Sequence, residues 1–316
     1  MEITKRIDAV TLIPKEYLAA TPPAPRSVKI ELTARCNYQC SFCALRTRVE
    51  KPQDIDIHLF KRITLEMAAY GVEEIGVFYL GESFCSPDLL LEAVTYLKAD
   101  LGLPYVFLTT NGSLAETRIV ESLMATGLDS LKWSINAATD EQFAKIMQVK
   151  PGLFHKALDH LRQAREIRDR HQFRTRIYAS SIRYDGDQQR QMEQLLQEHV
   201  LPYVDQHYWL PLYSMGSVAT QREEELGYRP IAGNQGRIGA LRDPLPCWAI
   251  FTEGHVTARG ILSACCFDAD GRFAMADLNE VSFTDGWKSL KFQKLRQAHL
   301  KNDITGTICE GCIAYS

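Results

Sequence analysis

The chain has 316 residues, of which 46% are hydrophobic and 24% charged, a composition typical of a globular protein. Its formal net charge of −3 gives no indication of a nucleic-acid partner held by bulk electrostatics, and no apolar run reaches the roughly 18–20 residues needed to span a bilayer. The N-terminus lacks the charged region and the apolar stretch of a signal peptide. We therefore expect a cytoplasmic protein with no nucleic-acid partner and no membrane partner.

Short β-rich runs alternate with helical stretches along the first two thirds of the chain. Residues 1–25 precede them and end in the Pro-rich stretch TPPAP, which we expect to block regular structure. Six strands are expected, at residues 27–33, 75–80, 105–110, 130–136, 174–181 and 206–212. Helices are expected between them at residues 56–70, 87–101, 114–126, 139–149, 153–170 and 187–199. Repeated strand–helix units favour an α/β fold with a parallel sheet, and six units indicate a partial (β/α)6 TIM-like barrel.

The rest of the chain is predicted to contain a bridge and a small domain. Residues 213–246 are polar and include a QREEE charge run, which we interpret as a solvated helix face. Residues 247–316 are poor in apolar residues, contain a helix expected near 286–299, and would gain stability from a bound metal centre. The predicted organisation is a lead-in (1–25), a barrel (26–212), a bridge (213–246) and a small C-terminal α+β domain (247–316).

Cysteines are grouped in two regions of the chain. In a reducing compartment, nine cysteines indicate metal binding or catalysis rather than disulfides. Cys36, Cys40 and Cys43 form a C-x3-C-x2-C loop directly after the first strand, where parallel barrels place their reactive groups. Three thiolates hold three irons of a 4Fe–4S cluster and leave the fourth open. Zinc is the alternative, although zinc sites usually pair C-x2-C with a second pair of ligands.

The segment CNYQCSFC resembles the cluster loop of the radical S-adenosylmethionine (SAM) superfamily. The resemblance implies that the open iron binds SAM, whose reductive cleavage gives a 5′-deoxyadenosyl radical that abstracts hydrogen from carbon. It also implies that Phe42 lies near the adenine. Gly81 and Glu82 resemble the family's Gly-Glu motif for the methionine amino group. Leu80 replaces the first glycine of that motif, and Ser83 replaces the proline that follows it.

Polar residues after the next three strands resemble further SAM contacts. Thr109 and Asn111 follow the third strand, and strand-end turn chemistry is their alternative role. Ser134 and Asn136 lie where the family often contacts the ribose or the carboxylate, although they could equally be ordinary polar strand ends. Arg183, after the fifth strand, is a looser candidate for the same role.

The C-terminal cysteines can saturate a second 4Fe–4S cluster. The four expected ligands are Cys247, Cys265, Cys309 and Cys312. This region resembles the twitch module, a shortened relative of the SPASM domain. Gly260 lies five positions before Cys265, as expected for a hairpin that presents a ligand, so Cys265 is favoured over Cys266. Because only four residues follow Cys312, we expect one auxiliary cluster rather than two, with a zinc ribbon as the alternative.

An auxiliary cluster suits a reaction in which an electron must leave a substrate radical. Loss of a proton and an electron after hydrogen abstraction gives net oxidation, such as alcohol to ketone. If a thiol instead returns a hydrogen atom to the radical, the result is epimerisation. Cys266 and Cys85 are the thiols left for that role, and the alternative for each is a small buried apolar residue.

Three functions are compatible with these features. The first is a radical SAM oxidoreductase or epimerase acting on a sugar-like or other small polar metabolite, favoured because about 25 residues before the first strand leave no room for a peptide-binding domain. The second is maturation of a ribosomally made peptide by epimerisation or crosslinking. The third is a non-catalytic iron–sulfur or zinc protein. Either enzyme would need a reducing partner such as flavodoxin or ferredoxin, and the fold does not name the substrate.

Overall fold

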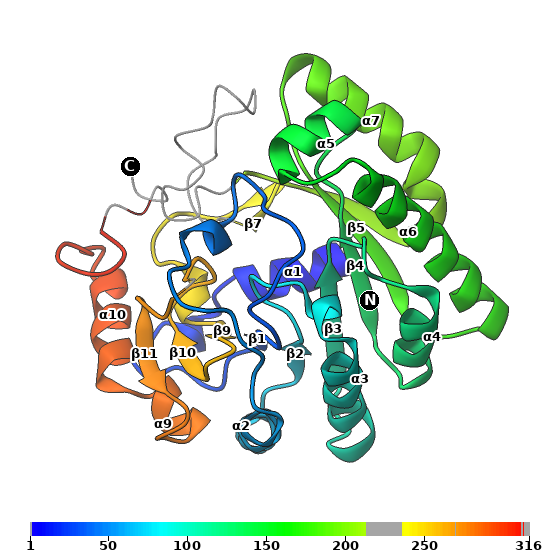
Figure 1. The fold of residues 1–316 in the computed structure, drawn as a ribbon. Helices are drawn as coiled ribbons and strands as arrows, with labels where there is room; N and C mark the ends of the chain where they lie inside the picture. The colour runs from blue at the N-terminus through cyan, green and yellow to red at the C-terminus, as the bar shows by residue number, and fades with distance from the viewer. Residues whose placement is uncertain (1, 213–235, 269, 311, 313–316) are drawn as a thin grey trace.

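A nine-stranded sheet forms the centre of the molecule (Figure 1). The computed structural model describes residues 2–212, 236–268, 270–310 and 312. The strand order is β11-β10-β9-β1-β2-β3-β4-β5-β6, and every pair from β9 to β6 is parallel. The strands are β1 (Ser27–Ile30), β2 (Glu74–Gly76), β3 (Tyr105–Thr110), β4 (Ser130–Ser134), β5 (Arg176–Ile182), β6 (Gln206–Leu210), β9 (Glu253–Val256), β10 (Ile261–Ser263) and β11 (Ala274–Asp277). The predicted partial barrel is confirmed.

Helices cover the outer face of the parallel strands (Figure 1). They are α2 (Ile57–Tyr70), α3 (Pro87–Thr95), α4 (Thr117–Ala125), α5 (Asp140–Met147), α6 (Gly152–His171) and α7 (Gly186–His199). α2 agrees closely with its prediction, because local signals fix both of its ends. The Asp56 side chain accepts a hydrogen bond from Leu59 N at the start, and Gly71 ends the helix with a φ of 104°.

Several predicted elements differ from the structure in length. β2 ends at Gly76 instead of residue 80, because the chain then turns toward the loop that follows β1. α3 ends earlier than predicted and continues as a π-helical turn, η4 (Tyr96–Asp100). The helix expected near 286–299 is divided into α9 (Phe283–Trp287) and α10 (Leu290–Leu300), because the Ser289 side chain caps a new helix start. The single-turn helices are η1 (Lys15–Tyr17), η2 (Ala44–Thr47), η3 (Ser83–Cys85), η5 (Leu201–Tyr203) and η7 (Trp248–Ile250).

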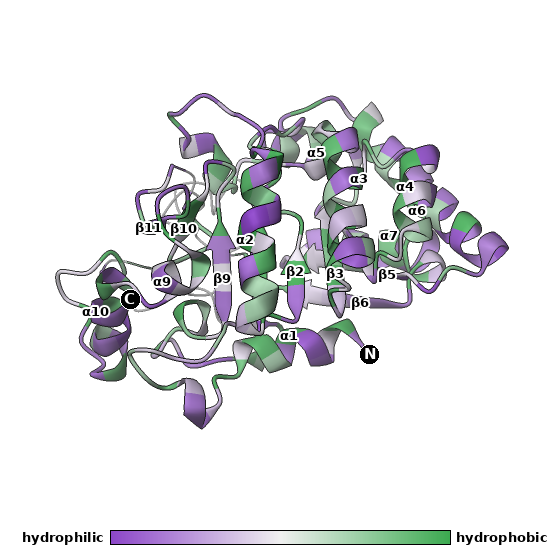
Figure 2. Cartoon of the chain, turned by 90° about the horizontal axis from the view of Figure 1, so that it is seen from below, coloured by the Kyte–Doolittle hydropathy of each residue, from purple (hydrophilic) through white to green (hydrophobic). Residues whose placement is uncertain are grey.

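The predicted lead-in (1–25) contains a helix that was not predicted. Residues Ile3–Thr11 form helix α1, the short η1 follows it, and the Pro-rich stretch at residues 21–25 has no regular structure, as predicted. α1 lies across the N-terminal ends of the barrel strands (Figure 2). Arg6 bonds to Glu74 at the start of β2, and Thr4 bonds to Gln206 at the start of β6. α1 therefore forms the floor of the barrel.

The C-terminal region continues the barrel sheet and its hydrophobic core. β9 pairs in parallel with β1 along four residues, from Ser27 opposite Glu253 to Ile30 opposite Val256. The region was predicted to be poor in apolar residues, but Phe251, Leu262, Phe283 and Trp287 are buried in the core that the barrel also fills. The described part of the region thus packs on the barrel and shares its core.

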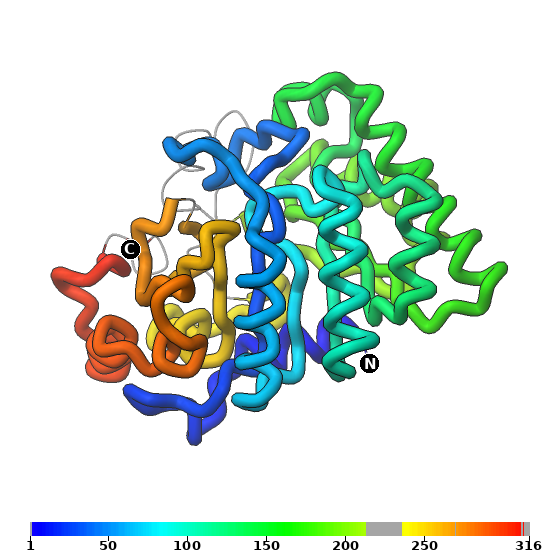
Figure 3. The backbone as a smooth tube through the Cα atoms, turned by 60° about the horizontal axis from the view of Figure 1, so that its bottom comes forward, coloured from blue at the N-terminus to red at the C-terminus, as the bar shows by residue number. Residues whose placement is uncertain are grey.

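Residues before β1 run beside the C-terminal helices (Figure 3). Trp287 Nε1 donates to Pro23 O over 2.9 Å, and Arg296 Nη1 donates to Ala20 O over 3.2 Å. Of the predicted bridge, residues 213–235 lie outside the described residues. The described remainder contains a small hairpin of β7 (Gly236–Arg237) and β8 (Ala240–Leu241). No helix in the described parts of the chain is long and apolar enough to cross a membrane.

Candidate active site

The loop after β1 presents three thiols to one cavity. Cys36, Cys40 and Cys43 all line a cavity of about 450 Å³. Cys43 N donates to Cys40 O over 3.1 Å, which closes the turn between these two cysteines. Burial first, and then the nearby Glu82 carboxylate, raise the pKa of Cys36 to about 12. Three clustered thiols that are hard to ionise on their own, facing a space much larger than one ion, fit an iron–sulfur cluster whose charge stabilises thiolates.

Helix α5 holds this cluster loop in place. Gln39 N donates to Met147 O over 3.1 Å, and Ser41 N donates to Ile146 O over 2.8 Å. The ring of Tyr38 packs edge-on against Phe143, with the ring centroids 5.4 Å apart. The backbone between the cysteines is therefore bound to the C-terminal turn of a neighbouring helix.

Glu31 joins three parts of the site that are distant in sequence. Its side chain is 1% exposed and accepts hydrogen bonds from Arg48 Nη2 at 3.0 Å, Gly81 N at 3.1 Å and Ala258 N at 3.2 Å. Burial raises the pKa of Glu31, and the guanidinium of Arg48 opposes that rise. The carboxylate thus connects the end of the cluster loop, the loop after β2 and the turn after β9. The sequence analysis did not find it, because its partners are not close to it in sequence.

Gly81 lies where the loops after β1 and β2 come closest. A Cβ atom on this residue would lie 1.9 Å from Thr33 O, so only glycine fits. The following residue, Glu82, is buried, and its N donates to Arg35 O over 2.8 Å. Its carboxylate accepts hydrogen bonds from Thr110 Oγ1 at 2.9 Å and from the backbone N that follows Thr110 at 2.7 Å. Burial outweighs these bonds and raises the pKa of Glu82 to about 7.

The other residues expected to contact SAM are placed in different surroundings. Asn111 is bound to the cluster loop, since its Nδ2 donates to Asn37 Oδ1 over 2.9 Å. Asn136 is bound to β5 instead, because its Oδ1 accepts from Ile182 N over 3.0 Å. Thr109 faces the barrel interior, whereas its neighbour Thr110 makes the bond to Glu82. Phe42 and Ser134 are half-buried, and Arg183 is exposed.

The four C-terminal cysteines proposed as ligands lie near one another. Burial raises the pKa of Cys309 to about 12, and Cys247 and Cys312 add to the rise. The pKa of Cys265 is also raised, through its hydrogen bond with Cys266 and burial first, and then through Cys247. Cys312 N donates to Cys309 O over 3.0 Å, as in a C-x2-C turn. These four partly buried thiols supply the number of ligands that a fully ligated second cluster needs.

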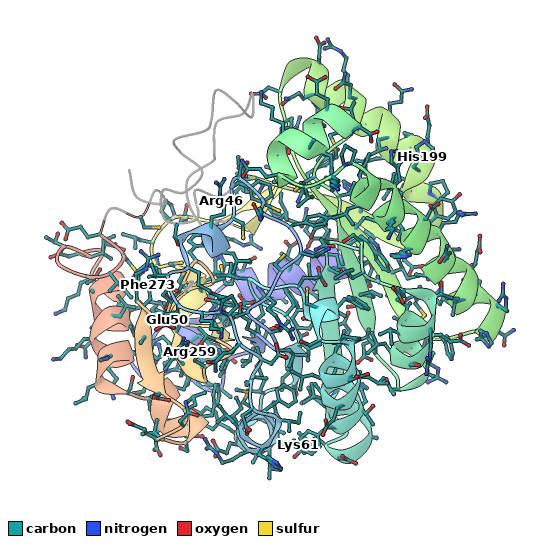
Figure 4. The ribbon with its side chains drawn as sticks, in the orientation of Figure 1. Arg46, Glu50, Lys61, His199, Arg259 and Phe273 are labelled. Carbon is teal, nitrogen blue, oxygen red and sulfur yellow. The ribbon has the colours of Figure 1, made fainter. Side chains whose placement is uncertain are left out.

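The segment after the cluster loop is held by the C-terminal region. Glu50 pairs with Arg259 over 2.5 Å, and Val49 N donates to an Asp270 carboxylate oxygen over 3.1 Å. Figure 4 shows Arg46, Glu50, Arg259 and Phe273 on the same side of the molecule, where this segment meets the C-terminal strands. The two cysteine groups thus belong to parts of the chain that bind each other directly.

A second cavity lies inside the barrel above α1. It has a volume of about 290 Å³ and includes side chains from α1, from β1, β3, β4, β6 and β9, and from the segment after β10. Its polar lining includes Lys29, Thr109, Lys132, Tyr208 and Glu253. The face of α1 that closes it contributes five residues, among them the apolar Ile3, Ile7 and Val10.

Cys266 and Cys85, the two cysteines that are not proposed as cluster ligands, differ in position. Cys266 lines the barrel cavity, beside the proposed ligand Cys265. A hydrogen bond with Cys265 lowers the pKa of Cys266 to about 7 against the effect of burial, and nearby Lys29 and His255 contribute. Cys85 lies on η3, close enough to Cys36 to affect its pKa, and does not line the barrel cavity. Only Cys266 therefore faces the interior of the barrel.

Two protein domains match this chain. The radical SAM superfamily domain matches residues 30–195, and the SPASM domain, an iron–sulfur cluster-binding domain, matches residues 247–313. The chain belongs to the radical SAM superfamily. Its two domains place it in the SPASM/twitch subgroup, as the cysteine spacing predicted. It is a radical SAM enzyme, and its expected cofactors are confirmed as SAM and 4Fe–4S clusters, including an auxiliary one.

Curated relatives match only part of their length. The chain is 35% identical over 133 residues to a probable GTP 3′,8-cyclase from Methanocella arvoryzae, covering 42% of this chain and 41% of that protein. It is 35% identical over 123 residues to a PqqA peptide cyclase from Methylobacterium nodulans, covering 38% and 31%. The matched region thus spans 41% and 31% of these two relatives, so it supports the family and leaves their reactions as properties of those proteins.

Solved structures share the fold at low sequence identity. BtrN in complex with AdoMet and 2-DOIA aligns with a TM-score of 0.56 and 14% identity, covering 87% of each chain. SuiB from Streptococcus suis, bound to precursor peptide SuiA, aligns with a TM-score of 0.66 and 15% identity, covering 93% of this chain and 71% of SuiB. The alignments extend over nearly the whole chain, so the barrel and the C-terminal region together form one shared architecture.

Proposed function

We propose that this radical SAM enzyme oxidises or epimerises a small polar substrate held in the barrel cavity. The observation that carries the proposal is the cavity itself, with about 290 Å³ of space, polar side chains and a floor closed by α1. Ligand pockets usually measure about 300–1,000 Å³, so this one suits a small metabolite. Its lining comes from α1, from the proposed barrel (26–212), from Gly236 of the proposed bridge (213–246) and from the proposed auxiliary-cluster domain (247–316).

The proposed cofactor ligands follow from the two thiol groups. Cys36, Cys40 and Cys43 would hold the open cluster that, with SAM, supplies a 5′-deoxyadenosyl radical. Cys247, Cys265, Cys309 and Cys312 would hold the auxiliary cluster, which supplies an electron acceptor. The proposed SAM contacts are Phe42, Gly81, Glu82, Thr109, Asn111, Ser134, Asn136 and Arg183. Among these, Gly81, Glu82 and Asn111 have the most direct support, because they bond to Glu31 or to the cluster loop.

Cys266 is the proposed hydrogen donor for the epimerase reaction. It lines the cavity in which the substrate would lie, whereas Cys85 does not. Its S–H bond would break and a new C–H bond would form on the opposite face of the substrate carbon. The sulfur radical left behind would regain one electron and one proton, the electron coming from a flavodoxin-type or ferredoxin-type reducing partner. In the oxidase reaction the substrate would lose a proton and an electron instead, and Cys266 would not react.

Maturation of a peptide is the second candidate function. The similarity to a PqqA peptide cyclase over 123 residues favours it, as does the fold shared with SuiB, a structure that contains a precursor peptide. In that case the barrel cavity would receive one side chain of the peptide, and the rest of the peptide would remain outside. The cavity residues that act on the reacting carbon would be the same as those proposed for a small metabolite.

A deuterium-transfer assay tests the proposal. The reconstituted enzyme is reduced under anaerobic conditions with SAM and deuterated candidate substrates, both sugar-like metabolites and short peptides. We expect deuterium in 5′-deoxyadenosine only with the true substrate class, together with an oxidised or inverted product. Cys266→Ala should still form the nucleoside but lose inverted product, and Cys85→Ala is the matched control that should keep it. Deuterium transfer from peptides alone would replace the first candidate with the second, and unchanged epimer from Cys266→Ala would reject the proposed donor.

A further inference from the structure

Three cationic side chains line the barrel cavity, and two of them are already neutralised. Arg6 forms a two-point ion pair with Glu74, at 3.0 and 2.6 Å. Lys29 pairs with Glu253 over 2.9 Å. Burial alone would lower the pKa of Lys29, but Glu253 outweighs it and the pKa is raised, so this pair stays ionised. Neither of these cations has a charge left over for a ligand.

Lys132 is the third cation, and it has no carboxylate partner. It lies on β4, and in the described parts of the chain no carboxylate oxygen lies within 4.0 Å of its Nζ. Its Nζ donates one hydrogen bond, to the Tyr208 hydroxyl at 3.2 Å, and lies 5.6 Å from the centre of the Tyr208 ring. An ammonium group carries three donors, so two remain. Among the cationic side chains that line the cavity in the described parts of the chain, Lys132 is therefore the one whose charge is not paired with a carboxylate.

A half-buried ammonium group of this kind favours an anion. Removing a charge from water costs free energy unless a partner of opposite sign replaces the water. The apolar side chains around Lys132 make that cost larger, since Phe78, Phe107 and Leu210 line the same cavity. Thr109, which pairs with Lys132 between β3 and β4, adds a hydroxyl beside it. Together these groups form a small site with one charge and several hydrogen-bond donors.

The position of Lys132 connects it to the proposed reaction. Lys132 and Cys266 line the same 290 Å³ cavity, so a small molecule held by one side chain is confined near the other. Lys29 also faces this space, because both Cys266 and Tyr208 influence its pKa. An anion that reached the Lys29 side would meet the Glu253 carboxylate and be repelled. The anionic end of a ligand is thereby directed to Lys132.

We propose that Lys132 binds one anionic group of the substrate, a carboxylate or a phosphate, with the Tyr208 hydroxyl and Thr109 as hydrogen-bonding neighbours. This inference rests on the proposed use of the barrel cavity for substrate. It narrows the substrate class from small and polar to small, polar and anionic at the bound end. Sugar acids, sugar phosphates and acidic side chains share that chemistry, and neutral sugars lack it.

Anion binding to the anaerobic, SAM-loaded holoenzyme tests the inference without the natural substrate. The probes are acetate, inorganic phosphate and neutral acetamide, followed by saturation-transfer NMR and calorimetry. We expect an anion to bind and acetamide not to bind. Lys132→Met should weaken that binding about ten- to hundredfold, the range for one hydrogen bond to a charged group. Lys132→Arg should keep most of it, and Lys156→Met, at an exposed position on α6, should leave it unchanged.

The outcomes separate this inference from the proposed function. Stronger binding of acetate indicates a carboxylate, and stronger binding of phosphate indicates a phosphate ester. Equal affinity in Lys132→Met and the unaltered enzyme, equal binding of acetamide, or no anion binding at all would overturn the inference, provided that the variant unfolds at the same temperature. Deuterium transfer from a neutral substrate would support the radical reaction while rejecting Lys132 as the anion site. Anion binding without any radical reaction would reject the proposed function alone.

Discussion

At the scale of single residues, a chain of charged groups crosses the wall between the barrel and the C-terminal strands. Glu253 accepts hydrogen bonds from Lys29 at 2.9 Å and pairs with His255 Nε2 at 2.8 Å. Burial alone would raise the pKa of Glu253, but Lys29 and His255 together outweigh burial and lower the pKa to about 2. β1 and β9 are thus joined by an ion pair as well as by backbone hydrogen bonds.

Glu253→Gln tests this ion pair through the dependence of stability on pH. A carboxyl group whose pKa falls from 4.5 to about 2 on folding contributes about 3 kcal/mol above pH 4.5, and the contribution decreases as pH falls toward 2. We expect the variant to lose roughly that free energy of unfolding at pH 7 and less at pH 4, measured by urea denaturation. Glu280→Gln, at an exposed position, is the control and should change little. A loss that does not depend on pH would contradict the assigned pKa.

Gly81→Ala tests the close contact between the first two loops. The added methyl group would lie 1.9 Å from Thr33 O, so the loop after β2 must move away from the cluster loop. A displacement of about 1 Å near a reacting centre can cost about a hundredfold in rate. We expect SAM cleavage to fall by about that factor while the chain stays folded. Gly152→Ala is the matched control, because no atom lies within 4 Å of its added methyl group. Equal cleavage in both variants would contradict the contact.

At the scale of elements, α1 acts as the floor of the barrel through one buried side chain. Arg6 is 5% exposed, and its guanidinium carbon lies 3.9 Å from the ring centre of Tyr105 and 4.5 Å from that of Phe107. With the ion pair to Glu74, this group holds the helix against β2 and β3. The cavity above it exists because the floor is closed.

Arg6→Met tests how firmly α1 is held. The change leaves Glu74 without its buried partner, which typically costs about 3–5 kcal/mol. We expect that loss in the free energy of unfolding, and faster hydrogen exchange in α1 than in β3. Lys5→Ala is the control on the same helix, because its pair with Glu2 is exposed at 71% and 59% and should contribute at most about 1 kcal/mol. Similar effects from both changes would show that α1 is not anchored by Arg6.

The comparison of predicted and observed elements shows which signals are local. Helix α2 was predicted closely because Asp56 and Gly71 mark its ends. α1 was missed because the prolines after it dominated the interpretation, although Ile3, Ile7 and Val10 repeat at helical spacing. Side chains alternate between the two faces of β3, so Thr109 faces the barrel cavity whereas Thr110 bonds to Glu82.

The site residues also divide into those that local sequence signals reveal and those whose partners are distant in sequence. The proposed ligands Cys36, Cys40 and Cys43 could be selected from sequence, because they are close together in one loop. The carboxylates Glu31 and Glu253 and the cation Lys132 could not, since their roles depend on partners up to 227 positions away. A lysine or a glutamate in the middle of a β-rich run is a signal that such a strand faces a polar interior. Lys29 and Lys132 each lie in the middle of such a β-rich run.

At the scale of the whole molecule, the barrel and the C-terminal region are one continuous structure. β9 extends the parallel sheet, the hydrophobic core is shared, and Ala20 and Pro23 accept hydrogen bonds from α10 and α9. We therefore expect one cooperative unfolding transition, seen at the same denaturant concentration by circular dichroism and by tryptophan fluorescence. Two separate transitions would show that the regions fold independently.

The central claim is that two separate cysteine groups hold two clusters and that only the first cleaves SAM. Iron content and 5′-deoxyadenosine formation, measured together after anaerobic reconstitution, test it most directly. We expect about eight irons per chain in the unaltered enzyme, and about four in each of two variants. Replacing Cys36, Cys40 and Cys43 by Ala should abolish the nucleoside, whereas replacing Cys247, Cys265, Cys309 and Cys312 by Ala should retain its formation. Stoichiometric zinc without nucleoside in the unaltered protein, or SAM cleavage that survives loss of the first group, would contradict the account.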